Sequence, residues 1–171
     1  MRQFLSHCPT VPLLTGVYSM AVQVMTNDPT RRSVTDALVA EWMTPDPYTC
    51  AVDASLADAR DMMAEYRCRR LPVVDDEGRL IGILSLGDVR QAAPSSVSSL
   101  SLFEINYFWA KLPVSSAMTP DPITITPTDT IKAACNKMLA HKISGLPVVH
   151  DHKVVGIFTE TDALRFLVSL D

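Results

Sequence analysis

Two short segments of the chain combine a hydroxyl side chain with an aspartate three positions later. They are Ser85-x-x-Asp88 and Thr159-x-x-Asp162. If a helix begins there, its free N–H groups and positive dipole end suit a phosphate, and the hydroxyl can donate to that phosphate. The aspartate can accept two hydrogen bonds from a diol such as that of a ribose. The same spacing is also a helix N-cap arrangement, worth about 1 kcal/mol without a ligand, so both interpretations stay open.

The second of these segments has the fuller set of polar groups. Thr161 places another hydroxyl directly before Asp162, whereas Gly87 stands before Asp88 and supplies no donor. We therefore expect the segment around Asp162 to bind the more tightly of the two.

A cluster of three arginines is the densest positive charge in the chain. Arg67, Arg69 and Arg70 lie within four positions. Their guanidinium groups suit the recognition of phosphate. Alternatively, their stems cover apolar surface while the charged heads pair with Asp75 or Asp76.

Catalytic chemistry has no comparable support. The sequence contains no nucleophile elbow and no phosphate-binding P-loop. His150-x-His152 offers two metal ligands, but no cysteine or third histidine lies nearby in the sequence, so we expect no metal site. Asp88 and Asp162 lie in different halves of the chain and are not expected to act as an acid–base pair. We therefore expect the chain to have no enzymatic activity and to need no obligatory cofactor.

These segments belong to a sequence pattern that occurs twice in the chain. Three blocks recur in order, and each begins at a corresponding residue: Met43 and Met118, Leu71 and Leu146, Gly82 and Gly156. The first two pairs stand 75 positions apart and the third pair 74, so the second copy is one residue shorter near its end. Such agreement indicates an internal duplication.

Each copy is predicted to fold in the order β-α-β-β-α. Apolar residues recur at helical spacing in both copies, namely at Leu56, Ala59, Met63 and Tyr66, and at Ile131, Ala134, Cys135, Met138 and Leu139. Asp53 or Ser55 and Thr128 or Asp129 are candidate N-caps. Apolar runs around polar turns at 75–78 and 150–153 indicate two hairpins. A further helix follows Ser85 and Thr159.

The repeated blocks resemble the CBS domain, and two such domains resemble a Bateman module. The motif is Met-Thr-x-x-Pro, a helix, Leu-Pro-Val-Val and Gly-Ile-x-(Ser/Thr)-x-x-Asp, and it covers roughly residues 36–171. The resemblance implies a mixed α/β (α+β) fold in which the two repeats form a pseudo-twofold pair with two clefts. We divide the chain into an extension (1–35), a first repeat (36–94), a linker helix (95–112) and a second repeat (113–171).

In proteins of this family the Ser/Thr and Asp positions hold the phosphate and ribose of an adenosyl ligand. Carried over by position, the resemblance implies one cleft formed by Asp162, Thr159, Thr161, Ser144, Ile157, Ala51 and Cys68. It implies a second cleft formed by Asp88, Ser85, Arg69, Ile83, Thr126 and Ile143. The ligand expected is AMP, ADP, ATP or a molecule of the S-adenosylmethionine class.

The linker helix carries more apolar surface than one small domain usually needs. Leu102, Ile105, Trp109 and Leu112 share one predicted face, which Phe103, Tyr107 and Phe108 widen. The face either joins the repeats or contacts a partner. Because a second copy of the chain would cover this apolar surface, we expect a homodimer.

Composition restricts the partners further. The 171 residues are 47% hydrophobic and 20% charged, with a net charge of −4 and no basic run, which argues against nucleic acid. No apolar stretch approaches the ~20 residues of a membrane helix, so no membrane partner is expected. Prolines interrupt the weakly signal-like start. The cysteines show no Cys-x-x-Cys spacing, which favours a reduced, cytoplasmic protein.

Two functions fit this pattern. The first is a stand-alone regulatory module that binds an adenosyl ligand and acts on itself or on a protein target that the sequence does not name. The alternative is a structural dimerisation module whose clefts stay empty. Retention of a hydroxyl and an Asp in both copies favours binding.

Overall fold

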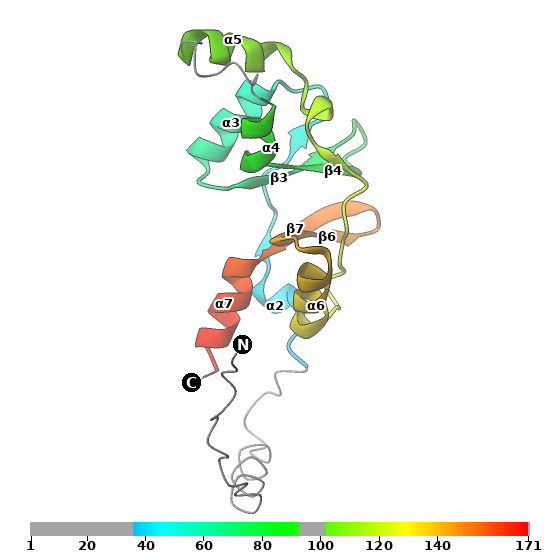
Figure 1. The fold of residues 1–171 in the computed structure, drawn as a ribbon. Helices are drawn as coiled ribbons and strands as arrows, with labels where there is room; N and C mark the ends of the chain where they lie inside the picture. The colour runs from blue at the N-terminus through cyan, green and yellow to red at the C-terminus, as the bar shows by residue number, and fades with distance from the viewer. Residues whose placement is uncertain (1–35, 93–101, 171) are drawn as a thin grey trace, which may run out of the picture. The chain divides into compact units, whose positions relative to one another are not determined.

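The two halves of the chain repeat one order of elements. The computed structural model describes residues 36–92 and 102–170. The first half contains β1 (Thr44–Pro45), β2 (Cys50–Ala51), α3 (Leu56–Glu65), β3 (Arg70–Val74), β4 (Leu80–Ser85) and α4 (Leu86–Gln91). The second contains β5 (Thr119–Pro120), α6 (Ile131–His141), β6 (Gly145–His150), β7 (Lys153–Thr159) and α7 (Glu160–Val168). The expected mixed α/β fold of two similar repeats is confirmed (Figure 1).

A short helical segment precedes each repeat. The helix α2 (Val39–Trp42) precedes the first, and α5 (Leu102–Lys111) with the 3₁₀ turn η1 (Val114–Ser116) precedes the second. The predicted extension 1–35 and the start of the predicted linker helix, 95–101, lie outside the described residues. In the described residues no helix is long and apolar enough to span a membrane.

Each repeat contains the predicted antiparallel hairpin. Leu71 lies opposite Leu84 in the first, and Leu146 lies opposite Phe158 in the second. The second hairpin turns through Asp151 and His152 alone, both with positive φ, as a two-residue turn of the favoured mirror-image type requires. This tight turn accounts for the residue that the second copy lacks.

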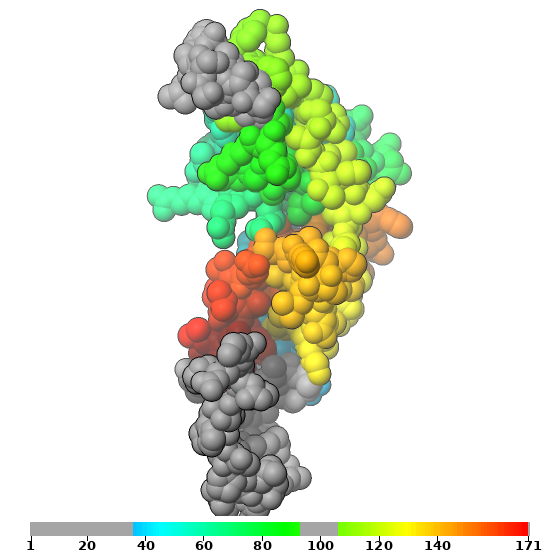
Figure 2. Space-filling view, viewed as in Figure 1, coloured from blue at the N-terminus to red at the C-terminus, as the bar shows by residue number. Residues whose placement is uncertain are grey.

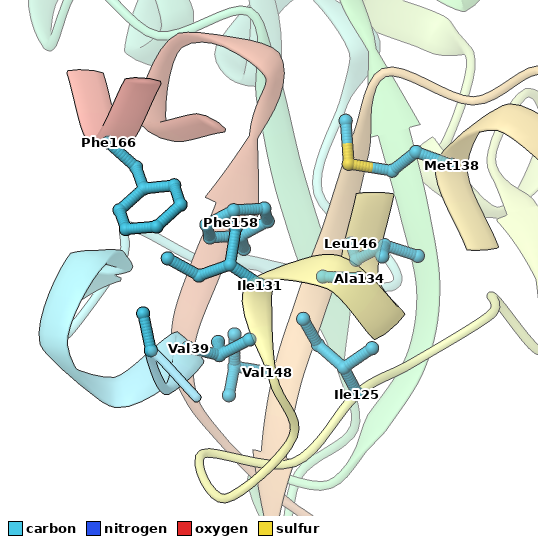
Figure 3. Packing of buried hydrophobic residues seen from close by; sticks show 10 residues of the cluster. Val39, Ile125, Ile131, Ala134, Met138, Leu146, Val148, Phe158 and Phe166 are labelled. Carbon is cyan, nitrogen blue, oxygen red and sulfur yellow. The ribbon is translucent and has the colours of Figure 1, made fainter. Parts of the chain in front are cut away.

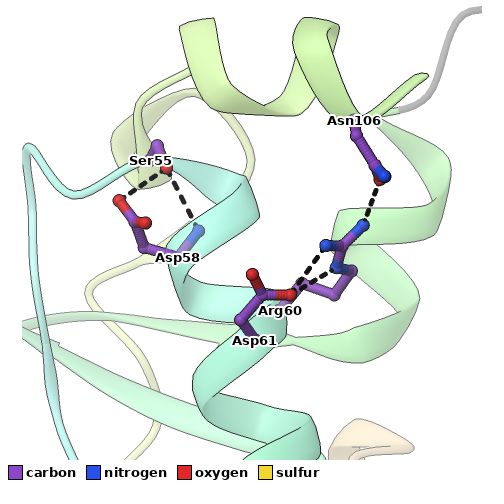
Figure 4. Close-up of polar contacts among 5 residues, drawn as sticks. All are labelled: Ser55, Asp58, Arg60, Asp61 and Asn106. Atoms are coloured by element: carbon purple, nitrogen blue, oxygen red, sulfur yellow. Dashed lines mark hydrogen bonds and ion pairs between the residues drawn. The ribbon is translucent and has the colours of Figure 1, made fainter. Parts of the chain in front are cut away.

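Hydroxyl side chains cap the first long helix of each repeat. Ser55 accepts the Asp58 N–H at 3.1 Å (Figure 4), as one of the two expected caps. In the second repeat the cap is Thr130, which accepts the Ala133 N–H at 3.2 Å. The expectation of Thr128 or Asp129 is wrong, because the Asp129 carboxylate accepts the Thr126 N–H instead, at 2.8 Å.

Each repeat has its own apolar core beneath its sheet. The core of the second repeat (Figure 3) is built from Val39, Ile125, Ile131, Ala134, Met138, Leu146, Val148, Phe158 and Phe166, with Ala37. The core of the first is built from Cys50, Leu56, Ala59, Met63, Leu71, Val73, Leu84, Val89 and Val114. Most of these residues are the predicted helix-face and hairpin positions, which supports the periodicity argument.

The opening strand of each repeat pairs with the sheet of the other. Thr44 in β1 lies opposite Ile157 in β7, and Thr119 in β5 lies opposite Ile83 in β4. The sheets therefore have the orders β1-β7-β6 and β2-β3-β4-β5. In the second repeat the strand corresponding to β2 is a single parallel bridge between Ile125 and Val148.

The segments before the repeats are exchanged in the same way. The Leu112 carbonyl, after α5, accepts the Leu56 N–H of the first repeat at 2.9 Å. The Ala37 carbonyl, before α2, accepts the Ile131 N–H of the second repeat at 2.9 Å. Figures 1 and 2 show α5 beside the helices of the first repeat. Each repeat is thus completed by the chain that leads into the other, which holds the two repeats in register.

Candidate ligand-binding site

Residues of both repeats enclose a cavity of about 340 Å³. Five residues of the predicted Asp162 cleft line it: Cys68, Ser144, Ile157, Thr159 and Thr161. The exchange of β1 brings Thr44 and Pro47 to the same cavity, since β1 lies directly beside β7. We refer to this space as the Asp162-side cavity.

Asp162 itself lies behind the cavity wall. Its side chain is 3% exposed, and one carboxylate oxygen accepts the Thr159 N–H at 2.8 Å and the Thr159 hydroxyl at 2.7 Å. The other oxygen accepts from Arg165 Nη1 at 3.2 Å. Asp162 therefore fixes where α7 begins, and the cavity is lined by the two threonines rather than by the aspartate.

The start of α4 repeats this arrangement. Asp88 accepts the Ser85 N–H at 2.8 Å and the Ser85 hydroxyl at 2.6 Å, while Ser85 caps the Asp88 N–H at 3.2 Å. Neither residue lines the Asp162-side cavity. The geometry is that of the helix cap foreseen as the alternative interpretation, and it leaves the binding role of Ser85 and Asp88 a prediction.

The remaining predicted residues are placed as follows. Ala51 pairs with Val74 and does not line the Asp162-side cavity, nor do Ile83, Thr126 or Ile143. Ile143 packs against the core of the second repeat. Arg69, which the resemblance assigns to the cleft of Asp88, lines the Asp162-side cavity. It reaches that wall because it lies in the chain between Cys68 and β3.

A stacked aromatic pair that the sequence analysis did not assign to the site also lines the cavity. The rings of Tyr48 and Tyr66 lie 3.7 Å apart at an interplanar angle of 12°. Tyr66 ends α3, and Tyr48 precedes β2. Ile123 and His141 occupy the corresponding positions of the second repeat, so a comparison of the two copies is the signal that marks this pair.

Three arginines contribute to the same wall. Arg67 and Arg69 are exposed, and Arg70 is half-buried. Arg70 crosses to the other repeat, where its guanidinium donates to the Ser144 hydroxyl. The alternative interpretation paired these arginines with Asp75 or Asp76, but Asp75 binds Arg79 at 2.8 Å.

The thiol in the wall is not poised for nucleophilic chemistry. Burial raises the pKa of the Cys68 thiol above its ordinary value of 9.0. The thiol is therefore protonated near neutral pH, and Cys68 contributes an apolar contact to the cavity.

Comparison with known proteins identifies the repeats. The family model of the CBS domain matches residues 39–95 and 114–169. Among curated relatives, homoserine O-acetyltransferase from Methanococcoides burtonii is 32% identical over 135 residues, which cover 78% of this chain and 25% of the relative. The chain thus spans about a quarter of the length of such curated relatives.

Two solved CBS-pair structures are covered almost completely by the match to this chain. CBSX2 in complex with AMP has a TM-score of 0.65 and 28% identity, covering 78% of this chain and 98% of that one. A CBS-domain pair in complex with 5′-methylthioadenosine and S-adenosyl-L-methionine has a TM-score of 0.66 and 27% identity, covering 79% of this chain and 98% of that one.

Proposed function

The chain belongs to the CBS-domain family, and on that premise we propose that it is a regulatory module that binds an adenosine-containing ligand in the Asp162-side cavity. The observation that carries this proposal is the cavity itself, to which the first repeat contributes aromatic and cationic side chains and the second repeat contributes hydroxyls. Structures of similar CBS pairs contain AMP, or 5′-methylthioadenosine and S-adenosylmethionine, which supports the same class of ligand here.

The cavity wall offers a distinct group for each part of such a ligand. Thr161, in the first turn of α7, provides a hydroxyl and a backbone N–H for a phosphate or a ribose. The Thr159 hydroxyl donates to Asp162 and can still accept a hydrogen bond from a ribose. The Tyr48–Tyr66 pair and Ile157 provide apolar and aromatic surface for a base. Because the wall comes from both repeats, a bound ligand would hold the repeats together.

Regulation would follow from the position of α7. The helix begins at the cavity wall, and its far end carries the exposed side chains of Leu167 and Val168. A ligand that shifts the start of α7 would change the surface offered to a second copy or to a target. We propose that the module acts in this way, as a homodimer and without catalysis of its own.

The alternative, a structural dimerisation module, is favoured by one observation. Asp162 and Asp88 are both satisfied as helix caps, so the repeated motif has a structural role whether or not a ligand binds. The two functions differ in whether nucleotides bind at all.

Calorimetric titration with AMP, ADP, ATP, 5′-methylthioadenosine and S-adenosylmethionine tests the proposal. We expect saturable binding of at least one ligand, with one molecule in the Asp162-side cavity of each chain. Thr161→Val should weaken that binding several-fold, because it removes an exposed hydroxyl of the wall without touching the cap. Thr128→Val, in the exposed turn before α6, is the matched control and should bind normally. If a well-folded protein binds none of the five ligands, the structural module is correct.

A further inference from the structure

Positive charge gathers at the Asp162-side cavity. Arg67, Arg69 and Arg70 all line the Asp162-side cavity. At the corresponding positions of the second repeat stand Lys142, Ser144 and Gly145, so the other side has one cation where this side has three. The two clefts implied by the duplication are therefore not equivalent in charge.

The three guanidinium groups are not neutralised by neighbouring carboxylates. Within residues 36–92 and 102–170, none of the three forms an ion pair. Glu160 is the single acidic residue among those that line the cavity, and its side chain is exposed. An anion entering the cavity would meet an excess of positive charge.

Arg70 fills the space beside Gly145 that a side chain at position 145 would otherwise occupy. A Cβ atom at the buried Gly145 would lie 3.2 Å from Arg70 Cδ and 3.3 Å from Arg70 Nε. Gly145 is the counterpart of Arg70, so the duplication has kept a long side chain on one repeat and removed it on the other. The guanidinium donates to the neutral hydroxyl of Ser144 and so keeps its full charge unpaired.

The surroundings of Arg70 disfavour its charge on balance. Burial lowers the pKa of the Arg70 guanidinium, Arg69 lowers it further, and Glu160 and Asp88 act in the opposite direction. A half-buried cation beside a second cation gains most from an anionic ligand, which a planar guanidinium can bind through two parallel hydrogen bonds.

We infer that the Asp162-side cavity selects its ligand by charge, taking an adenosine-containing ligand that ends in phosphate over a sulfonium or an uncharged thioether, and that Arg70 sets this preference. The inference rests on the proposed function and names the ligand class for the same site. A phosphate monoester brings about −1.5 to −2 charges to the three arginines. S-Adenosylmethionine brings a sulfonium, and 5′-methylthioadenosine brings no charge at all.

Competition between these three ligands tests the inference on the wild-type chain. In calorimetric titrations at low salt, we expect AMP to bind at least tenfold more tightly than 5′-methylthioadenosine or S-adenosylmethionine. The preference should shrink in 0.5 M NaCl, because added ions screen the partly exposed arginines. A hydrophobic or shape-based preference would not respond to salt in this way.

Single substitutions then test which arginine causes the preference for a phosphate. Arg70→Gln keeps a donor for Ser144 and removes the charge, so AMP should weaken at least tenfold while 5′-methylthioadenosine changes less than twofold. Arg69→Gln should also weaken AMP binding. Because the Arg69 side chain is exposed, this substitution should leave the fold stable. Arg90→Gln, exposed in the last turn of α4 and away from the cavity, removes the same charge elsewhere and should leave both affinities unchanged.

Three outcomes would overturn the inference. Equal affinity of the wild type for all three ligands would do so, as would a preference for S-adenosylmethionine. If Arg70→Gln and Arg69→Gln each weaken the affinity for AMP and for 5′-methylthioadenosine to the same degree, these residues shape the cavity and do not discriminate ligands by charge. Binding without charge preference removes this inference alone, whereas binding of no adenosyl ligand removes the proposed function with it.

Discussion

Asp162 and Asp88 each hold the backbone N–H and the hydroxyl of the residue three positions earlier. A ligand diol at either residue would have to share the carboxylate with that cap. Sharing is feasible because a carboxylate offers about four acceptor sites. Both aspartates fit the cap interpretation of the Ser/Thr-x-x-Asp motif, in which they fix the first turn of the helix. A ligand diol could use the remaining acceptor sites of Asp162 only if that buried carboxylate became accessible from the cavity.

Burial should make the two aspartates unequal in their effect on folding. We expect Asp162→Ala to lower the free energy of unfolding by about 1–3 kcal/mol, because it removes the cap, whose carboxylate is buried, and leaves the part-buried Thr159 N–H without its acceptor. Asp88→Ala should cost less, about 1 kcal/mol, since Asp88 is only half-buried. Urea denaturation measures both. Glu65→Ala, exposed at the end of α3, should stay within about 0.5 kcal/mol. An equal cost for both aspartates would contradict the burial argument.

The buried thiol of Cys50 predicts a loss of stability in alkali. Burial raises the pKa of Cys50 from 9.0 to about 11. Because the folded pKa lies above the unfolded one, the stabilisation is fully present below pH 9 and is lost as the pH rises through about 11. Thermal melts from pH 8 to 11 should show a falling melting temperature, and Cys50→Ala should flatten that slope while lowering stability at all pH values. An unchanged slope in the variant would assign the effect to other groups, such as Cys68.

At the scale of elements, the two repeats are joined by exchanged strands. Gly82 and Gly156 make this exchange possible, because Met118 and Met43 lie where a Cβ atom would be. The Met-Thr block of one repeat and the Gly-Ile block of the other are thus two halves of one contact. Their recurrence in the sequence therefore reflects a packing requirement.

A double-mutant cycle tests this pairing of blocks. Gly156→Ala should destabilise the chain by about 1–3 kcal/mol, because the added methyl group displaces the Met43 sulfur and separates β1 from β7. In the Met43→Ala background the same substitution should cost much less, since the obstructing side chain is gone. Chemical denaturation of the four proteins measures the coupling energy. Additive costs would mean that the methionine moves aside freely.

Local patterns account for what the sequence predicted of these elements. Helical periodicity and the hairpin turns identified α3, α6 and both hairpins, because each depends on residues close together in the chain. The exchange of β1 and β5 was not predicted, since nothing in a two-residue strand specifies a partner in the other repeat. For the same reason, neither the place of Arg69 in the wall of the Asp162-side cavity nor the contact of Tyr48 with Tyr66 was predicted.

At the scale of the whole molecule, the two repeats differ in how their helices are covered. In the first repeat α5 packs against α3, and Arg60 lies over the Trp109 ring at 5.1 Å and bonds to Asn106 (Figure 4). Trp109 and Leu112 pack on the core, as a joining helix would, while Tyr107 remains 58% exposed. The side chains of 102–105 lie outside the described residues.

In the second repeat the corresponding surface is apolar and open in the part of the chain that the structure describes. Four side chains on α6 and α7 are largely exposed: Leu139 (78%), Leu164 (61%), Leu167 (56%) and Val168 (74%). Single exposed leucines are common, but Leu164, Leu167 and Val168 stand at i, i+3 and i+4 on one face of α7. The helix α7 packs against α6, which carries Leu139, and we refer to these four residues as the patch; exposed apolar surface of this kind marks interfaces. We therefore base the expectation of a homodimer on this surface rather than on α5 alone.

We predict that two chains pair through this patch around a twofold axis. Such an interface places the same apolar residues on both sides and so covers them all at once. Leu167→Glu or Leu139→Glu should then convert a dimer into a monomer at tens of micromolar, since each dimer would have to bury two carboxylates in apolar surroundings. Light scattering across a dilution series measures the state, and denaturation of the monomeric variants checks that each still folds.

A matched substitution on the other helix decides between the two surfaces. Tyr107→Glu places the same charge at an exposed aromatic of α5 and should leave the dimer intact. If Tyr107→Glu dissociates the chains and Leu167→Glu does not, the aromatic face of α5 is the interface. If the wild type is monomeric at tens of micromolar, the patch does not pair two copies. Because α7 connects this patch to the cavity, saturating ligand should also shift the dimer dissociation constant, and the reciprocal effect must appear in ligand affinity.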